Sequence, residues 1–129
     1  MISIDDFKKI DIKIGEILSA EKVPETDKLL RLEVSFGLKP QSGSPDQSIS
    51  SGLGEKDIRQ IVSGISAYFP DPQVLVGKKC AFVANLEPRT IKGLESQGMI
   101  LAVSGGEGDV TFFSLLESTP NIPAGTSAK

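Results

Sequence analysis

The chain has 129 residues, of which 39% are hydrophobic, so it can fold around one modest core and we expect a single domain. It contains no histidine and one cysteine, which excludes Ser-His and Cys-His catalytic pairs, an internal disulfide and a Cys/His zinc site. Its formal net charge of −3 has the wrong sign for a protein that coats nucleic acid nonspecifically. No apolar run is long enough to span a membrane and no signal peptide is recognisable, so we expect a cytoplasmic protein.

Alternating apolar and polar residues predict a series of short strands. At the N-terminus, Ser3 and Asp6 have the spacing of a capping box, and we expect a helical turn at residues 4–9. Isoleucines at every second position over 10–14 predict a first strand that bends at Gly15. The other predicted strands are 29–36, 59–64, 78–84, 98–104 and 109–115, with GGEG at 105–108 interpreted as a turn. This density of strands and turns is typical of a small β-barrel.

Residues 37–57 interrupt this pattern. Ser, Gly, Pro and charged residues dominate the segment, and few apolar side chains are available to anchor it. Compact hairpins rarely use so long a connection, so we interpret it as a flexible surface insertion.

The loop from Asn85 to Leu101, NLEPRTIKGLESQGMIL, has the composition of a binding loop between two strands. Hydrogen-bonding side chains are concentrated in it: Asn85, Arg89, Thr90, Lys92, Ser96 and Gln97. Residues 59–104 carry five basic and three acidic side chains, whereas residues 105–129 carry one basic and three acidic ones. The loop therefore suits an anionic, polar partner, although composition alone favours a solvated hairpin connection whose charges keep it soluble.

This loop, together with DFKKIDIKIGEI at 6–17, DKLLRLEV at 27–34 and RQIVSGI at 59–65, resembles the tRNA-binding domain family. That family includes the C-terminal domain of bacterial methionyl-tRNA synthetases, stand-alone structure-specific tRNA-binding proteins and domains of eukaryotic synthetase-associated cofactors. The resemblance implies an all-β, five-stranded OB-fold barrel over residues 1–129, with short helical segments and a C-terminal extension. It also implies noncatalytic binding of folded tRNA by shape and backbone contacts, without a cofactor. The segment 37–57 departs from the family pattern.

The resemblance places RNA contacts on the loop and on the adjoining barrel face. The implied tRNA-binding residues are Lys28, Arg31, Ser63, Asn85, Arg89, Lys92, Ser96, Gln97 and Met99. Arg89 and Lys92 can neutralise phosphates, whereas the amide and hydroxyl groups can bind a 2′-hydroxyl or a base edge. Met99 either packs against a base or ribose, or lies in the core with Leu101 and Val103. Lys28 and Arg31 have an alternative role in surface ion pairs with Glu25, Asp27 or Glu33.

Aromatic residues offer few stacking platforms for bases. Phe36, Phe82, Phe112 and Phe113 are better explained as core or interface residues. Tyr68 and Phe69 follow the third predicted strand, where one ring can remain exposed. A binder with so few exposed rings must depend mainly on RNA shape and phosphate contacts.

The expected partners are tRNA, a second copy of the chain and the catalytic part of a methionyl-tRNA synthetase. The family resemblance implies a homodimer formed through the chain ends, and the apolar residues within 112–129 suit that role. The alternative is that this segment closes the core of the monomer. The chain is not expected to be an enzyme by itself, but a part or detached equivalent of methionine-tRNA ligase. The alternative function is that of a CsaA-like chaperone or secretion-associated polypeptide-binding protein.

Overall fold

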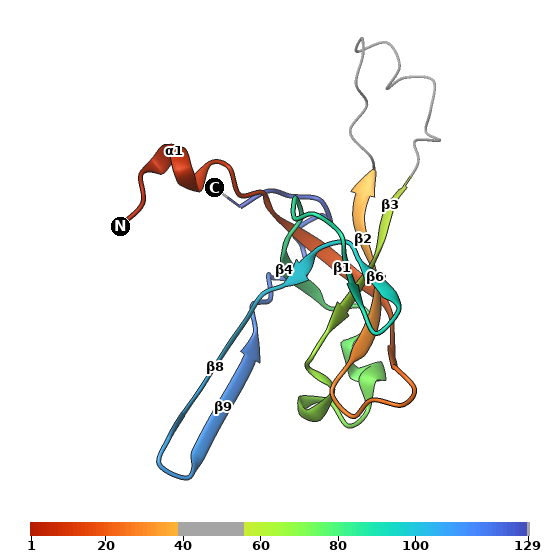
Figure 1. The fold of residues 1–129 in the computed structure, drawn as a ribbon. Helices are drawn as coiled ribbons and strands as arrows, with labels where there is room; N and C mark the ends of the chain where they lie inside the picture. The colour runs from red at the N-terminus through yellow and green to blue at the C-terminus, as the bar shows by residue number, and fades with distance from the viewer. Residues whose placement is uncertain (39–55, 129) are drawn as a thin grey trace.

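A curled antiparallel sheet of five strands carries the core of the protein (Figure 1). The computed structural model describes residues 1–38 and 56–128; most of the predicted insertion at 37–57 lies outside them. The strand order in the sheet is β3-β2-β1-β4-β7, from β1 (Ile12–Lys22), β2 (Leu30–Leu38), β3 (Lys56–Ser63), β4 (Lys79–Val83) and β7 (Met99–Ile100). The remaining elements are α1 (Ile4–Phe7), the 3-10 helices η2 (Ser66–Tyr68) and η3 (Pro72–Leu75), and the hairpins β5 (Arg89–Ile91) with β6 (Leu94–Ser96) and β8 (Ala102–Glu107) with β9 (Val110–Leu115).

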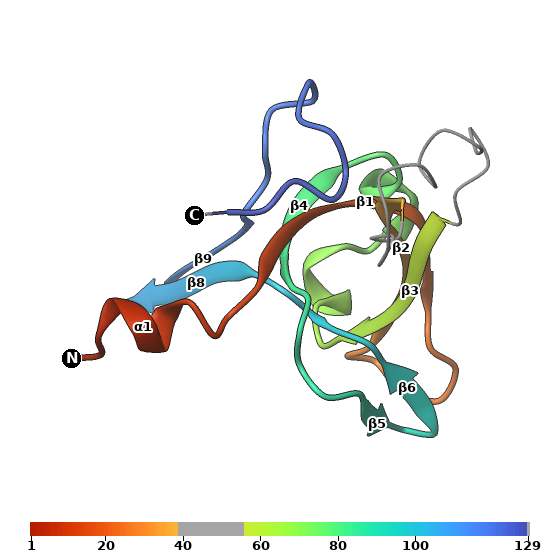
Figure 2. The same ribbon diagram turned by 90° about the horizontal axis from the view of Figure 1, so that it is seen from above.

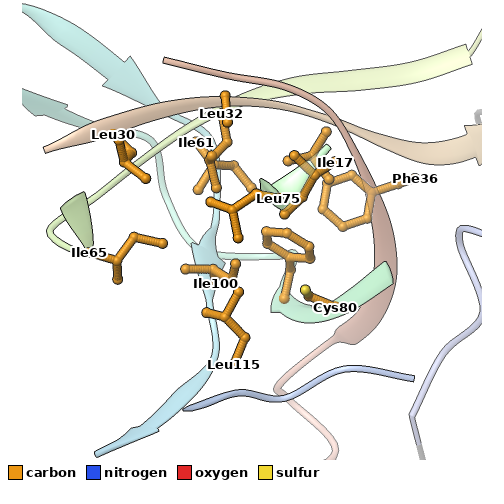
Figure 3. Close-up of a cluster of buried hydrophobic side chains, with 13 residues drawn as sticks. Ile17, Leu30, Leu32, Phe36, Ile61, Ile65, Leu75, Cys80, Ile100 and Leu115 are labelled. Carbon is orange, nitrogen blue, oxygen red and sulfur yellow. The ribbon is translucent and has the colours of Figure 1, made fainter. Parts of the chain in front are cut away.

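The inward faces of the strands form one continuous core (Figure 3). In β2 the predicted alternation is confirmed, because every second residue from Leu30 to Phe36 is at most 3% exposed. These residues pack against Ile17, Ile61 and Phe82 from neighbouring strands. The core is therefore made by side chains that alternate along strongly curved strands, as an OB-like barrel requires.

Gly15 lets β1 curl tightly over this core. A Cβ atom at this position would lie 2.6 Å from Cγ1 of Val34 and 3.0 Å from ring atoms of Phe36 and Phe82. The predicted special role of Gly15 is thus explained by close packing, and the shift in register between β1 and β2 follows at Ile17 to Ser19.

Side chains and backbone of residues 96–97 close the barrel at the outer edge of β3 (Figure 2). The Val62 amide donates to Ser96 Oγ at 3.0 Å. The Gln60 amide donates to Gln97 Oε1 at 3.0 Å, and the Gln97 amide donates to the Gln60 carbonyl at 2.8 Å. These bonds replace the regular ladder that a longer last strand would form with β3.

The prediction that 98–104 and 109–115 are barrel strands is wrong for most of their length. The chain leaves the barrel after Ile100, and β8 and β9 form a separate hairpin that projects from it (Figure 1). The reason is that another segment pairs with β4 at this point. The Ala81 amide donates to Leu116 O, so residues that follow β9 occupy the edge of β4 along which β7 would otherwise continue. The turn of this hairpin is Gly108–Asp109, so most of the predicted GGEG turn belongs to β8.

The C-terminal segment closes the monomer, in agreement with one of the two alternatives left open by the sequence. Leu115 is 5% exposed and lies in the core, whereas the neighbouring Phe112 is 58% exposed. Further along, the Ile14 amide donates to Thr126 O and the Ala128 amide donates to Ile12 O, so the tail pairs with the edge of β1. Nothing in this pairing uses Phe112, which stays available for other contacts.

At the N-terminus, the predicted helical turn is present but shorter than expected. Ser3 caps α1, with the Asp6 amide donating to Ser3 Oγ at 3.1 Å. No residue of α1 is buried. In the described part of the chain, no helix has the length and apolar character needed to cross a membrane.

We expect Gly15→Ala to lower the free energy of unfolding by about 1–3 kcal/mol, because the added methyl group overpacks the core. Gly64→Ala is the matched control, since its Cβ would meet nothing closer than Lys28 O at 4.0 Å. Urea unfolding followed by circular dichroism measures both variants. Unchanged stability of Gly15→Ala would contradict the packing argument.

Candidate nucleic-acid interface

The β5–β6 hairpin carries two basic side chains at the surface of the barrel. Its two-residue turn is Lys92–Gly93, with φ angles of 52° and 80°. Positive φ at both turn positions is typical of the tight turns that match the twist of a β-hairpin. Lys92 therefore lies at the tip and Arg89 at the base of β5, and both side chains are exposed. Neither forms an ion pair with another described residue.

Ser96 and Gln97 attach this hairpin to the barrel. Ser96 is 4% exposed, and its hydroxyl group accepts from the Val62 amide and lies 3.1 Å from the Gly98 carbonyl, to which it donates. The Gln97 side chain accepts from the Gln60 amide. Both polar groups thus have internal partners, and any direct contact of theirs with RNA stays a prediction.

Asn85 fixes the start of the same loop. Its Oδ1 accepts from the Asp11 amide at 2.9 Å, and its Nδ2 donates to the Lys9 carbonyl at 2.7 Å. The last backbone bond between the two segments runs from the Ala84 amide to Asp11 O. The Asn85 side chain adds two further bonds beyond it and so extends the pairing of β1 with β4. Asn85 is exposed as well, so its contact with RNA also remains a prediction.

Met99 lies on the surface, and the alternative that placed it in the core is wrong. It is 44% exposed, whereas Ile100 is 6% exposed and points into the core. The register is set by Gly98, whose φ of 151° and approach to Val83 O leave no room for a side chain. Val103, which the sequence grouped with Met99, is 50% exposed.

Arg31 lies next to the hairpin on the outer face of the barrel. It forms an ion pair with Glu21, and not with the predicted partners Glu25, Asp27 or Glu33. Antiparallel pairing explains the choice, because Glu21 and Arg31 are opposite each other in the register of β1 and β2. Both side chains are about half exposed, so this pair contributes little to stability.

Shallow hollows connect Arg31 to the hairpin. A hollow of about 170 Å³ lies between Arg31, Lys22 and Leu94 of β6. A second one, of about 250 Å³, is lined by Arg31, Gln60 and Gln97, among others. The structure therefore brings Arg31 and the hairpin onto one surface.

Lys28 and Ser63 lie further along this surface. Lys28 is exposed in the turn between β1 and β2, and its carbonyl accepts from the Ser66 amide at 3.1 Å. Ser63 is partly buried and pairs with Leu30 at the end of β3. The basic predicted contacts thus extend from the hairpin tip past Arg31 to the β1–β2 turn, with Ser63 the least accessible of the barrel-face residues, whereas Asn85 lies beside residues 9–11.

Two residues that support the site were not predicted from the sequence. Gln60 donates from Nε2 to the Glu95 carbonyl at 2.8 Å and so holds β6 from the barrel side. Arg59 is partly buried, where it donates to both carboxylate oxygens of Asp57 and lies 5.0 Å from the centre of the Phe36 ring. Arg59 thus supports the site from the barrel side, where it also lines the hollow that contains Arg31 and Gln97. The signal in the sequence was the polar character of both residues at the start of the predicted strand 59–64.

Cys80 has no role at this surface. Burial, and to a lesser degree the nearby Glu117, raises the pKa of the Cys80 thiol to about 11. At neutral pH the side chain is therefore a protonated thiol in the core, unsuited to nucleophilic chemistry.

The curled five-stranded sheet and the basic hairpin fixed to its edge define a small OB-like binding domain. A family model described as "Putative tRNA binding domain" matches residues 52–127, and the chain belongs to this family. Both the family resemblance and the fold class predicted from the sequence are confirmed.

Curated relatives are much longer than this chain. The methionine–tRNA ligase of Deinococcus radiodurans is 38% identical over 129 residues, which cover 100% of this chain and 16% of the ligase. The methionine–tRNA ligase of Flavobacterium johnsoniae is 40% identical over 121 residues, 94% of this chain and 14% of the ligase. The chain therefore spans only a small part of the ligases it matches.

Two solved structures have nearly the same length as this chain. The crystal structure of a MetRS related protein from Pyrococcus horikoshii is 31% identical, with a TM-score of 0.75, and covers 100% of this chain and 98% of the other. The chaperone CsaA from Bacillus anthracis str. Ames is 26% identical, with a TM-score of 0.72 and coverages of 100% and 99%.

Ser96→Ala should lower the free energy of unfolding by about 1–3 kcal/mol, because the buried Val62 amide loses its acceptor. Ser104→Ala, at an exposed position of β8, is the control and should change stability by less than about 0.5 kcal/mol. Thermal and urea unfolding measure both. If the two variants are equally stable, the Ser96 hydroxyl does not hold the edge of β3.

Proposed function

We propose that this domain binds folded tRNA without catalysing a reaction, through the surface formed by the β5–β6 hairpin and the adjoining face of β1 and β2. The observation that carries the proposal is the pair Arg89 and Lys92, exposed on a hairpin whose base is held by hydrogen bonds to β3. A hairpin held in this way presents its charges without a large ordering cost on binding. The family membership supports the same ligand.

The residues of this surface have different roles in the proposal. Arg89, Lys92 and Lys28 neutralise phosphates, and Arg31 does so once it exchanges Glu21 for the ligand. Met99, exposed beside the hairpin, packs against a ribose or an unstacked base. Asn85, Ser96 and Gln97 act by holding the loop in place, because internal bonds already use both polar groups of Asn85, the Ser96 hydroxyl and Gln97 Oε1. Ser63 contributes at the margin of the surface.

We further infer that the domain assists a methionyl-tRNA synthetase, either as a part of it or as a detached equivalent. The identity of 38–40% to segments of two methionine–tRNA ligases supports this assignment. In that arrangement the domain is not an enzyme by itself, and the catalytic part supplies the specificity for methionine and its tRNA.

Arg89→Ala and Lys92→Ala should each weaken binding to all tRNAs similarly, because phosphate contacts carry no sequence information. Each should also reduce the slope of log affinity against log salt by roughly 0.7–0.9, the value for one lost phosphate contact. Gln97→Ala should lower affinity with an unchanged slope, since its side chain is neutral. Titrations at several salt concentrations measure these effects.

The control for this experiment is Lys8→Ala. Lys8 is exposed at the end of α1, which projects from the barrel away from β5 and β6 (Figure 2). Its removal should leave both affinity and slope unchanged. If Arg89→Ala and Lys92→Ala behave like Lys8→Ala while remaining folded, the hairpin is a solvated connection and the proposal fails.

A homodimer is the second part of the proposal. Apolar side chains are exposed on α1 and on the β8–β9 hairpin: Ile4 at 65%, Phe7 at 38% and Val103 at 50%. In both views these two elements project from the same side of the barrel, away from β5 and β6 (Figures 1 and 2). Association of two such sides around a two-fold axis would bury them and leave the basic surfaces free.

Val103→Asp should convert a dimer to a monomer at micromolar concentration, because a charge would enter the apolar contact. Sedimentation velocity measures the change, with Thr90→Asp, at an exposed position of β5, as the control that should leave the dimer intact. Truncation before Phe112 is unsuitable, since residues 116–128 pair with β4 and β1. A wild-type chain that sediments as a monomer would contradict the proposal.

The same exposed apolar side chains favour a second candidate function, the binding of unfolded polypeptide. A solved relative, 26% identical, is described as the chaperone CsaA. Titration of the wild-type domain with folded tRNA and with a reduced, unfolded polypeptide separates the two candidates. Binding of the polypeptide alone would support this second function against the first.

A further inference from the structure

An aromatic cavity lies at the base of β9, apart from the basic hairpin. Its volume is about 380 Å³, within the range of ligand sites. Four of the lining residues are aromatic, Tyr68, Phe69, Phe112 and Phe113, and the rim includes Lys78 and Glu117. Lys78 Nζ lies 3.3 Å from Glu117 Oε1, so a donor and an acceptor stand side by side at the edge of an aromatic hollow.

The ring of Tyr68 is held in one orientation. It stacks on Phe113, with ring centres 3.9 Å apart and planes only 7° from parallel. Phe113 in turn meets the edge of Phe69 at 5.8 Å, and both phenylalanines pack against the core. The Tyr68 amide donates to Ile65 O at 3.1 Å, which fixes the backbone of η2. Tyr68 is nevertheless 50% exposed, because Phe113 covers only one face of its ring.

A fixed, half-exposed ring beside a donor and an acceptor suits one kind of ligand in particular. An unpaired nucleobase is flat on its faces and has donors and acceptors on its edge, so it can stack on Tyr68 and meet Lys78 and Glu117 at the rim. An aliphatic side chain would use the ring but would form no hydrogen bond with Lys78 or Glu117, whose remaining donor and acceptor positions a base edge can use.

The cavity continues the surface proposed for tRNA. The hollow that contains Leu94 of β6 also contains Lys22, and Lys22 lines a further hollow with Ser66 and Ala67. Ala67 directly precedes Tyr68 in η2. A series of neighbouring hollows therefore lies between the β5–β6 hairpin and the residue that precedes the aromatic cavity.

We propose that this cavity binds one unpaired nucleobase of the RNA held by the basic surface, with Tyr68 as the stacking platform. The inference rests on the proposed function, and it adds to it a contact with one unpaired base of the folded RNA. The sequence suggested too few exposed rings for stacking, and Tyr68 supplies one. Because stacking involves no charge on Tyr68, its contribution to affinity is independent of salt.

Tyr68 is the only tyrosine of the chain, so 3-fluorotyrosine labelling gives a single ¹⁹F resonance that reports on the cavity. Addition of folded tRNA should shift this resonance. Tyr68→Ala should weaken tRNA binding roughly tenfold, with the salt slope unchanged, as expected for one lost stacked base. Tyr68→Phe keeps the ring and should keep the affinity, whereas Tyr68→Leu keeps bulk without a ring and should lose it. Thermal unfolding checks that all three variants fold.

The outcomes separate this inference from the proposed function. If tRNA binding depends on Arg89 and Lys92 but neither moves the ¹⁹F resonance nor responds to Tyr68→Ala, the inference is overturned and the function stands. If wild-type protein binds no tRNA, the proposed function fails and the inference fails with it. A resonance that shifts with protein concentration alone, or only with unfolded polypeptide, would assign the cavity to a second copy or to a peptide and would also overturn the inference.

Discussion

The closure of β3 by residues 96 and 97 is the constraint on which the rest of the structure depends. A curled sheet leaves two edges unpaired, and each unpaired backbone group in a buried edge is costly. Here the last barrel strand is only two residues long, so the side chains of Ser96 and Gln97 satisfy the amides of Val62 and Gln60. Two polar side chains, with one backbone bond from the Gln97 amide to the Gln60 carbonyl, thus complete the barrel.

This closure couples the core to the binding surface. Ser96 is the last residue of β6 and Gln97 follows it, so the hairpin with Arg89 and Lys92 is joined to the barrel at the point of closure. Its position is determined by hydrogen bonds that the fold needs anyway. A basic hairpin is therefore presented in a defined orientation without any residue devoted to that purpose alone.

Much of the fold follows from local patterns, because alternation in β1 and β2 reflects a simple periodicity. The sequence also indicated where the loop of residues 85–101 lies, since its hydrogen-bonding side chains are close together in the chain. What it could not show were long-range pairings. The partners of Asn85 and Gln97 are 74 and 37 residues away, and the exposure of Met99 depends on a register set at Gly98. The projection of β8 and β9 depends on Leu116 taking over the edge of β4.

The exit of the chain from β2 is fastened on two sides. Leu38 pairs with Lys56 across the connection, and Gly37 approaches Ala124 so closely that a Cβ atom would lie 2.6 Å from its carbonyl oxygen. The ladder is thus complete before the intervening 17 residues begin. Doubling the length of such a connection costs only about 0.6 kcal/mol in closure entropy. Evolution can therefore lengthen, shorten or replace this segment while the barrel keeps its register, which makes it a natural position for grafting new sequence.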